Sequence, residues 1–406
     1  MNFPSRSFDV IIAGAGPAGS SAAIHLATNG LSVLLADQKK FPRPKLCGEF
    51  ISPECWEHFE RLGVNEKMVV SQGTPLRKTV FYARDGRSVA VPSEWFGAAG
   101  SALGLSRSEM DHNLLNRAKE CGVTVLEEAQ AYGLVMNDGV VKGVTLRTPR
   151  GQENYLAPIT IDATGRARAL ARKLDPDDQK HHLRKKPLVA FKAHQVNAHV
   201  EEGTCEIYVY PGGYGGINGI EGGVTNLCFI VSAEYARRCN SDPDRLISTF
   251  VSRNSRAASV LKDARAATPW LAVALEHFGR QSLVPATGLL TAGDAAAFID
   301  PFTGSGMLMA LESGELVAST ISSRLKRLDA YSFKELARDY RRDYARKFES
   351  RLRLSSWLRR AAFVPRLAEV VIFLTGNDRL RERIARATRK SKLTQTDLPV
   401  GPRFST

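Results

Sequence analysis

The first regular pattern in the chain reads FDVIIAGAGPAG at residues 8–19, an apolar β-branched run followed by three glycines spaced as Gly-x-Gly-x-x-Gly. The run at 8–13 predicts a buried parallel strand, and the small and apolar residues at 20–29 predict a helix. A second apolar run at 31–36 predicts the next strand and leads directly into Asp37. This order of strand, glycine turn, helix, strand and acid predicts a Rossmann-like dinucleotide-binding unit.

Each glycine of this pattern has its own physical role. Gly14 permits the tight turn, Gly16 lets the backbone approach a pyrophosphate, and Gly19 lets the helix pack close to the strand. The first turn of the helix offers free N–H groups to phosphate, and an acid after the second strand accepts hydrogen bonds from ribose hydroxyls. This pattern by itself does not distinguish FAD from NAD. The expected dinucleotide contacts are Gly14, Gly16, Pro17, Ala18, Gly19 and Asp37.

The composition is that of an ordinary globular protein. The 406 residues are 43% hydrophobic and 24% charged, which excludes a disordered or collagen-like chain and allows about two or three domains. No apolar window reaches the roughly 18 residues of a membrane-spanning helix, and the N-terminus lacks the features of a signal peptide. The six cysteines show no Cys-x-x-Cys spacing and the eight histidines no metal-binding motif. We therefore expect a cytoplasmic protein with reduced thiols and no metal.

The positive charge is concentrated near the C-terminus. The formal net charge is +14, and residues 324–392 hold 21 Lys/Arg against 8 Asp/Glu. One interpretation is a helical cap whose apolar stripe packs on the body; the other is a surface that meets an anionic membrane or an acidic carrier protein. A nucleic-acid partner is not expected because no recognition motif is present. The stripe at helical spacing consists of Phe348, Leu352, Ser355, Leu358 and Ala361.

Two later segments extend the nucleotide-binding pattern. Residues 160–165, TIDATG, predict a strand that ends in a small-residue turn. Residues 289–296, LLTAGDAA, predict a strand entering a Gly-Asp pair, followed by FIDPFTGSG at 298–306 and a long helix at 307–322. Taken alone, Asp294 of that pair would be interpreted as a helix N-cap.

Together these segments closely resemble the FAD-dependent oxidoreductases of the p-hydroxybenzoate hydroxylase superfamily, and within it the geranylgeranyl reductase-like branch, which is related to flavin-dependent halogenases. The resemblance runs from about Phe8 to about Ser322. It implies that Asp294 holds the ribityl chain of FAD and that the loop 301–306 lies along the flavin. A helix N-terminus there would stabilise the negative charge of reduced flavin. The further implied contacts are Gly165, Gly293, Pro301, Gly304, Ser305 and Gly306.

The segment FPRPKLCGEFISP at 41–53 resembles the Arg-x-Lys-x-Cys-Gly segment of the same branch. The resemblance places Arg43 and Lys45 beside the pyrophosphate or the charge of reduced flavin, and Cys47 with Gly48 beside the flavin ring. Cys47 is a candidate catalytic residue; the alternative is a buried thiol that fills space. Family members also place an arginine like Arg107 near the cofactor, whereas the alternative is a surface arginine before a helix at 113–121.

Between Pro187 and Ser232 the pattern changes to strand-like alternation, which predicts strands at 188–196, 206–210 and 225–231. The segment IYVYPGGYGG at 207–216 partly resembles the aromatic-Phe-Pro motif that lines the substrate cavity of geranylgeranyl reductases. We therefore expect Tyr208 and Tyr210, which project from one face of a strand, to line a substrate cavity. The alternative is an aromatic pair in the core of an ordinary sheet. The chain lacks the Trp-x-Trp-x-Ile-Pro motif of halogenases, so halogenation is disfavoured.

The expected fold is α/β and discontinuous along the chain. A Rossmann-like FAD-binding domain takes residues 1–75, 105–180 and 281–325, and an antiparallel β-sheet substrate domain takes 76–104 and 181–280. A basic helical region takes 326–406.

The expected function is that of an FAD-dependent oxidoreductase acting on an apolar or aromatic small molecule, isoprenoid or polyketide-like, lipid or carrier-bound. FAD would move hydride to or from a carbon–carbon bond. The close alternative is a monooxygenase, hydroxylase or epoxidase, that uses NAD(P)H and O₂; a non-catalytic flavoprotein binding a partner through its basic tail is a third. Only one nucleotide fingerprint is present, so NAD(P)H is expected as a transient reductant. The basic tail would allow a peripheral membrane location.

Overall fold

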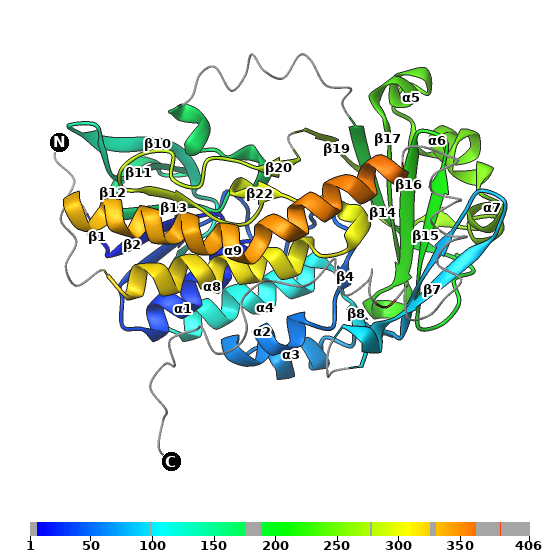
Figure 1. The fold of residues 1–406 in the computed structure, drawn as a ribbon, viewed down its shortest axis with the longest axis horizontal. Helices are drawn as coiled ribbons and strands as arrows, with labels where there is room; N and C mark the ends of the chain where they lie inside the picture. The colour runs from blue at the N-terminus through cyan, green and yellow to red at the C-terminus, as the bar shows by residue number, and fades with distance from the viewer. Residues whose placement is uncertain are drawn as a thin grey trace.

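A computed structural model describes residues 6–96, 100–174, 188–276, 278–324 and 330–362, together with residue 382. Its two main regions lie side by side in Figure 1. One is a layered α/β region built on a parallel sheet, and the other is a large sheet of long strands. The long helix α9 (Ala330–Ala362) runs across the first region toward the second. This arrangement confirms the expected α/β class.

The parallel sheet has five strands in the order β21-β13-β2-β3-β9. The strands span Leu289–Thr291 (β21), Ile159–Asp162 (β13), Val10–Ala13 (β2), Val33–Ala36 (β3) and Thr124–Leu126 (β9). Every residue of β2, β3, β13 and β21 is buried, because both faces of the sheet are covered and each strand can therefore be apolar throughout.

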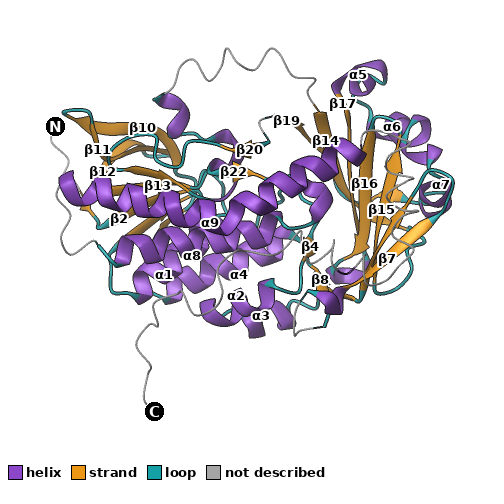
Figure 2. Cartoon of the chain, in the orientation of Figure 1, coloured by secondary structure: helices purple, strands orange, loops and turns teal. Residues whose placement is uncertain are grey.

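Different elements cover the two faces of the parallel sheet (Figure 2). Helices α1 (Pro17–Thr28), α4 (Arg107–Glu120) and α8 (Gly306–Ser322) form a layer on one face. The meander β10 (Gln130–Asn137), β11 (Val140–Thr148) and β12 (Gly151–Leu156), joined at its edge by β1 (Arg6–Ser7), covers the other. Alternate strand residues face the two sides, as the side-chain period of two requires: Ile12 packs with the helices and Ile11 with the meander.

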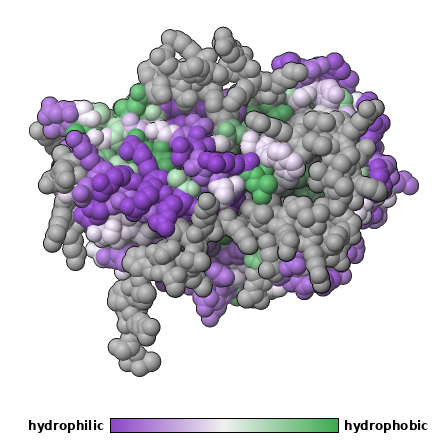
Figure 3. Space-filling model, in the orientation of Figure 1, coloured by the Kyte–Doolittle hydropathy of each residue, from purple (hydrophilic) through white to green (hydrophobic). Residues whose placement is uncertain are grey.

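Helix α9 packs on α8 and thereby closes the helical layer. The Tyr340 hydroxyl donates to the Thr291 carbonyl at 2.7 Å, and Arg351 donates to Glu312 at 2.5 Å. Of the predicted apolar stripe, Phe348 and Ser355 are buried and Leu352 is partly buried, whereas the side chains of Leu358 and Ala361 lie outside the described residues. The described part of the basic region is therefore a packed helix with a hydrophilic outer face, visible in Figure 3.

The large sheet has eight strands, in the order β18-β14-β17-β16-β15-β6-β7 with β19 also paired to β14. All its pairs are antiparallel except the parallel pair β15–β6. Helices α5 (Ala233–Arg238), α6 (Pro243–Thr249) and α7 (Ser255–Val260) lie on one face. The strands are β6 (Lys78–Tyr82), β7 (Ser88–Pro92), β14 (Leu188–Val196), β15 (Thr204–Tyr210), β16 (Gly213–Gly219), β17 (Thr225–Ser232), β18 (Arg265–Ala266) and β19 (Leu271–Leu275).

Strand β16 is glycine-rich and was not among the predicted strands. Its neighbours explain the composition: a Cβ at Gly213 would lie 2.0 Å from the Ile230 carbonyl oxygen, and a Cβ at Gly215 would lie 2.8 Å from the Cβ of Phe229. The glycines allow strands to approach where larger residues would clash. Residues 213–219, whose glycine content is typical of a loop, therefore form a central strand of the sheet.

Smaller elements connect the two regions. A three-stranded sheet joins β4 (Phe50–Ile51), β8 (Ala102–Gly104) and β5 (Thr74–Leu76), and β20 (Gly279–Arg280) pairs with β22 (Ala297–Phe298). Helices α2 (Cys55–Leu62) and α3 (Asn65–Val70) follow β4 along the chain. Among the described residues, no helix is both long and apolar enough to cross a bilayer.

Candidate active site

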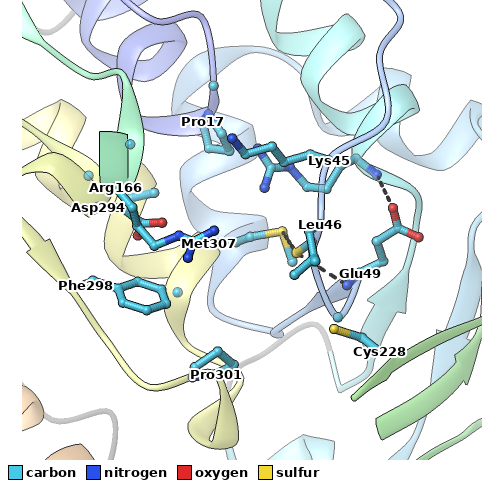
Figure 4. A pocket seen from close by; sticks show the side chains of 18 of the residues that line it. Pro17, Lys45, Leu46, Glu49, Arg166, Cys228, Asp294, Phe298, Pro301 and Met307 are labelled. Carbon is cyan, nitrogen blue, oxygen red and sulfur yellow. Dashed lines mark hydrogen bonds between the residues drawn. The ribbon is translucent and has the colours of Figure 1, made fainter. Parts of the chain in front are cut away.

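A cavity of about 590 Å³ opens between the parallel sheet and the large sheet (Figure 4). One end is formed by the turns after β2, β3, β13 and β21, so it lies at the carboxyl edge of the parallel sheet, where ligands bind in open α/β folds. The other end is formed by residues of β6, β7, β14, β15, β16, β17 and β19. The cavity therefore joins a nucleotide-type site to the face of the second sheet.

The glycine turn after β2 is tightly packed. Gly14 has φ +100°, and a Cβ there would lie 2.3 Å from the Ala163 carbonyl oxygen. A Cβ at Gly19 would lie 1.8 Å from the Gly14 carbonyl oxygen, so only glycine allows α1 to start so close to the turn. At Gly16 the nearest atom to such a Cβ is a side-chain nitrogen of Arg107, 3.8 Å away. The backbone at Gly16 is thus open for a phosphate at the N-terminus of α1.

Asp37 is a buried acid that directly follows β3. Its Oδ2 accepts the Ala15 N–H at 2.9 Å and its Oδ1 accepts the Lys39 N–H at 2.9 Å, and Arg43 pairs with it at 3.3 Å. A carboxylate has about four acceptor positions, so these bonds fix its orientation and leave capacity for ligand hydroxyls. Asp37 lines the cavity beside the glycine turn.

Three cationic side chains line the cavity next to this turn: Arg43, Lys45 and Arg107. Asp111 anchors two of them, because it accepts two hydrogen bonds from Arg107 at 2.8 and 2.7 Å and pairs with Arg43 at 3.3 Å. Burial would lower the pKa of Arg107, but the adjacent Asp111 raises it above its ordinary value. Burial and the nearby guanidinium groups of Arg107, Arg43 and Arg166 lower the pKa of Lys45. Arg107 is 9% exposed and lies in the cavity, so it is not a surface arginine.

Asp294 follows β21 in the chain and lies beside Arg166 in Figure 4. Burial raises its pKa, whereas the charges of Arg166, Lys45 and Arg107 lower it, and the balance is a raised pKa. Gly293 before it has φ +62°, and a Cβ there would lie 2.7 Å from the Ala18 Cβ. The Gly-Asp pair therefore packs directly against the start of α1.

The loop after β22 leads into α8 and forms one wall of the cavity. Asp300 accepts the Phe302 N–H at 2.9 Å, Gly304 has φ +62°, and α8 begins at Gly306. The Thr303 and Ser305 hydroxyls lie 2.8 Å apart, and Ser305 is fully buried. The loop thus presents the N-terminus of a 17-residue helix to the cavity, where free N–H groups favour negative charge.

Cys47 and Glu49 lie in the loop that passes between the two regions. The Cys47 Sγ accepts the Glu49 N–H at 3.4 Å and lies 4.0 Å from the Met307 Sδ, while Asn226 on β17 donates to the Cys47 carbonyl at 3.1 Å. Glu49 has φ +51° and is 1% exposed. Both residues line the cavity, and Figure 4 shows Glu49 and Met307 on opposite sides of Leu46.

Tyr208 and Tyr210 do not line the cavity, which corrects the sequence prediction. Both are buried on the helix-covered face of the large sheet, where Tyr208 donates to Glu206 at 2.8 Å and Tyr210 to the Ile230 carbonyl at 3.0 Å. The cavity face of β15 carries Ile207 and Val209 instead. Side chains alternate along a strand, so a phase error of one residue transfers the whole set to the other face. The alternative interpretation, an aromatic pair in the core, is the one that the structure shows.

The aromatic residues that do line the cavity come from other segments. Tyr214 on β16 donates to Asp300 at 2.5 Å, and its ring lies 5.2 Å from that of Phe302. Phe81 on β6 lies 5.5 Å from Phe302. Sequence reasoning missed this group because its members are distant in the chain; the available signal was the alternation of β16, in which Tyr214 and Asn218 share the cavity face.

The structure brings most of the predicted site residues to this one cavity. Gly19 and Ser305 are not on its surface: Gly19 packs against the glycine turn, and Ser305 is buried behind the loop. Sequence reasoning also missed Arg166 and Met307, which line it. The predicted residues on the cavity wall are Gly14, Gly16, Pro17, Ala18, Asp37, Arg43, Lys45, Cys47, Gly48, Arg107, Gly165, Gly293, Asp294, Pro301, Gly304 and Gly306.

The chemistry of the wall fits FAD. The N-terminus of α1 and the three cations suit a pyrophosphate, Asp37 and Asp294 offer carboxylates to ribose and ribityl hydroxyls, and the N-terminus of α8 suits an anionic ring edge. No group of His, Cys, Asp and Glu that could hold a metal ion occurs among the described residues. The wall beyond this end is mainly apolar, with Val89, Val91 and Ile207 among its members.

Comparison with known proteins agrees with this geometry. Residues 7–341 match the family model described as FAD binding domain. The digeranylgeranylglycerophospholipid reductase of Methanosarcina mazei is 26% identical over 317 residues, which cover 76% of this chain and 74% of that protein. The menaquinone reductase of Mycobacterium tuberculosis is 29% identical over 330 residues, which cover 78% and 77%.

Solved structures show the same fold. A geranylgeranyl bacteriochlorophyll reductase-like protein from Thermoplasma acidophilum has a TM-score of 0.78 at 20% identity, covering 94% of this chain and 96% of the other. The flavin-dependent brominase Bmp2 has a TM-score of 0.78 at 19% identity, covering 94% and 93%. The resemblance to this group of flavoproteins is thereby confirmed. The family match extends over residues 7–341, so the chain belongs to the FAD binding domain family and is an FAD-dependent oxidoreductase.

Proposed function

We propose that this protein is an FAD-dependent reductase that saturates a carbon–carbon double bond in the chain of an isoprenoid lipid. The observation that carries the proposal is the wall of the cavity beyond Asp294, to which strands β6, β7 and β15 contribute the apolar side chains of Phe81, Val89, Val91, Ile207 and Val209. An apolar chain can be buried there without leaving a charged group unpaired. The named substrates of the two reductases compared above, a digeranylgeranyl lipid and a menaquinone, both carry prenyl chains, which supports the same class here.

The residues around the glycine turn would hold FAD in a fixed orientation. We assign Gly16 and the N-terminus of α1, with Arg43 and Arg107, to the pyrophosphate, Asp37 to the adenosine ribose and Asp294 to the ribityl chain. When bound, FAD supplies hydride chemistry. The residues of the large sheet then hold the substrate chain and exclude water, and Lys45 contributes positive charge at the end of the cavity next to the glycine turn.

The reductase proposal is tested with the FAD-loaded protein under anaerobic conditions. The protein is reduced with dithionite, freed of excess reductant, and mixed with geranylgeraniol in detergent micelles. The expected result is return of the oxidised flavin spectrum together with a product two mass units heavier. Oxidised flavin without a heavier product, or no reoxidation at all, would contradict the proposal.

A second candidate is oxygenation of an aromatic ring. The observation that favours it is the aromatic group of Tyr214, Phe302 and Phe81, which could pack against a ring in the cavity. Admitting oxygen to the reduced protein separates the two candidates. A transient peroxyflavin-type spectrum supports oxygenation, and its absence with a saturated product supports reduction.

We further propose NAD(P)H as the reductant and a peripheral membrane position for the protein. Arg338, Arg342, Arg346 and Arg353 on α9 are each more than half exposed and would meet anionic headgroups. Co-sedimentation with vesicles of phosphatidylglycerol and phosphatidylcholine tests this, with phosphatidylcholine alone as control. Bleaching of the flavin by NADH or NADPH tests the reductant, and an unbleached flavin would exclude both.

A further inference from the structure

Gly216 on β16 lies on the wall of the cavity. A glycine weakens a strand and often marks a place where another group approaches closely. Fixed atoms of the neighbouring strand exclude a Cβ at Gly213 and at Gly215. At Gly216 the nearest atom to an added Cβ is instead the end of a side chain, the Cδ1 of Ile207, at 2.7 Å, and the Glu206 carbonyl oxygen follows at 3.4 Å, an ordinary contact. The packing of the strands therefore does not by itself require glycine at this position.

Ile207 on β15 lies over Gly216. The two residues are partners in the antiparallel pair β15–β16, and both line the cavity. Because the glycine carries no side chain, the end of the partly buried Ile207 side chain occupies the position that a Cβ of residue 216 would take. The Cδ1 is the far end of a side chain that changes rotamer, so a methyl group at position 216 would push it into the cavity and leave the strands paired.

Aromatic rings border the same part of the cavity. Phe81 on β6 is the partner of Ile207 in the pair β15–β6, and Tyr214 shares the cavity face of β16 with Gly216. The ring of Phe302, in the turn before α8, lies 5.5 Å from that of Phe81 and 5.2 Å from that of Tyr214. The position of the Ile207 side chain beside these rings therefore sets the width of the cavity at this level.

We propose that Gly216 and Ile207 together make the cavity wide enough for the methyl branches of a prenyl chain, and thereby select an isoprenoid over a linear unsaturated chain. This inference rests on the proposed reductase function. Each isoprene unit carries a methyl branch on its double bond, so a prenyl chain is wider than a linear chain at the bond that is reduced. Ile207 contacts the substrate and determines the specificity, and Gly216 is a positioning residue that acts through Ile207.

The kinetic test compares geranylgeraniol with a linear analogue that has the same double bonds and no methyl branches. FAD-loaded protein is reduced anaerobically, and its reoxidation by each alcohol in detergent micelles is followed. The ratio of the two rates, branched over linear, should fall by about tenfold in Gly216→Ala, because a methylene-sized change in an apolar pocket is worth about 10–200-fold. Gly133→Ala on β10, outside the cavity, is the matched control and should keep the wild-type ratio.

A double variant, Gly216→Ala with Ile207→Val, tests whether the effect passes through Ile207. Valine lacks the Cδ1 that the new Cβ would meet, so the double variant should regain the wild-type ratio. An unchanged ratio in Gly216→Ala, or a lowered ratio that the double variant does not regain, would overturn the proposal. If Gly216→Ala is purified without flavin, Ile207→Phe takes its place, because it narrows the cavity without altering β16. Its ratio should also fall, and an unchanged ratio there would overturn the proposal as well.

A binding measurement separates this inference from the reductase function. The oxidised FAD-loaded protein is titrated with each alcohol in the same micelles, and the change in flavin absorbance gives the two Kd values. Gly216→Ala should weaken the binding of geranylgeraniol by about tenfold relative to the linear analogue. If neither alcohol reoxidises the reduced wild type, the reductase function fails, and the ratio of Kd values still decides whether the pair sets the width. An equal ratio of Kd values in wild type and Gly216→Ala would overturn the inference, and a wild type that binds neither alcohol would overturn both.

Discussion

The two regions that meet at the cavity build their walls in different ways. In the parallel-sheet region the wall is mostly main chain and charged ends: the glycine turn at Gly14, the N-termini of α1 and α8, and the acids Asp37 and Asp294. In the large sheet the wall is a set of alternate side chains from seven strands. The first wall is set by local turns, and the second by the pairing register of strands far apart in the chain.

This difference has a consequence for substitution. A turn that depends on close main-chain contacts has almost no tolerance for an added Cβ, whereas a sheet face can exchange one apolar side chain for another and change only its shape. We therefore expect the parallel-sheet region to lose cofactor when altered and the large sheet to change substrate preference.

The largest effect is expected from Gly19→Ala. The new Cβ would lie 1.8 Å from the Gly14 carbonyl oxygen, which forces α1 away from the turn and the phosphate position. We expect protein purified without flavin, with a free energy of unfolding lower by about 3 kcal/mol, at the upper end of overpacking costs. Flavin absorbance per protein and urea unfolding measure both.

The control for that variant is Gly133→Ala on β10. A Cβ there would lie 3.6 Å from the Thr145 Cβ, an ordinary contact outside the cavity, so flavin content should match the wild type. Stoichiometric flavin in purified Gly19→Ala would contradict the expectation that the turn wall does not tolerate an added Cβ.

Glu312→Gln, at the contact of α8 and α9, is expected to lower the stability of the protein and to leave FAD binding unchanged. Glu312 accepts from Arg351 at 2.5 Å, and Arg351 is 2% exposed. Replacing the carboxylate by an amide removes the negative charge that faces the buried Arg351 guanidinium at this contact, which costs about 3 kcal/mol in the free energy of unfolding. Urea unfolding at pH 7 measures this difference, and FAD content should remain that of the wild type.

The same pair predicts a pH dependence. Burial would raise the pKa of Glu312, but the charges of Arg351 and Lys347 lower it below its ordinary value. A lowered folded-state pKa gives stability that is present above the unfolded pKa of about 4.3 and is lost as pH falls through the folded value. The gap between wild type and Glu312→Gln should therefore narrow below about pH 4. A gap that stays constant to pH 3 would contradict this origin.

A smaller effect is expected from Asp294→Asn. The substitution keeps the shape but removes a carboxylate whose hydrogen bonds to hydroxyls are worth about 1.5–3 kcal/mol, so FAD affinity should fall by roughly tenfold or more. Fluorescence titration of apoprotein with FAD measures it. Asp85→Asn is the control, because Asp85 is 46% exposed in the turn between β6 and β7 and lies outside the cavity. Equal affinity in the two variants would remove Asp294 from the FAD site.

The same contrast explains what could be predicted from the sequence. The glycine turn, the acid at position 37 and the Gly-Asp pair at 293–294 each sit within a short segment whose local pattern defines its geometry, so the elements around them were predicted from residues alone. Arg107 could be placed only by resemblance, because its burial depends on Asp111 one turn later and on the loop of Cys47.

The large sheet was harder because its face depends on register. Strands at 188–196 and 225–231 were predicted and found, with one extra residue in the second, but the glycine-rich β16 was missed. The face of β15 was assigned wrongly. The alternation shows that the two tyrosines share one face of the strand, but it does not show whether that face meets the cavity or the helices. Helices α5, α6 and α7 cover the face that carries the tyrosines, and these helices come after residue 232 in the chain.

The smallest effect, and the most direct test of the two faces, comes from replacing one tyrosine hydroxyl on each. Tyr214→Phe removes the bond to Asp300 on the cavity wall, and Tyr208→Phe removes the bond to the fully buried Glu206 on the opposite face. Each should lower the free energy of unfolding by about 1 kcal/mol, because a single hydrogen bond is lost. Only Tyr214→Phe should change KM for geranylgeraniol, since only Tyr214 lines the cavity. Glu206 keeps its two bonds to Arg256 in Tyr208→Phe, so the sheet stays intact and any change of KM in that variant would place Tyr208 on the substrate path after all.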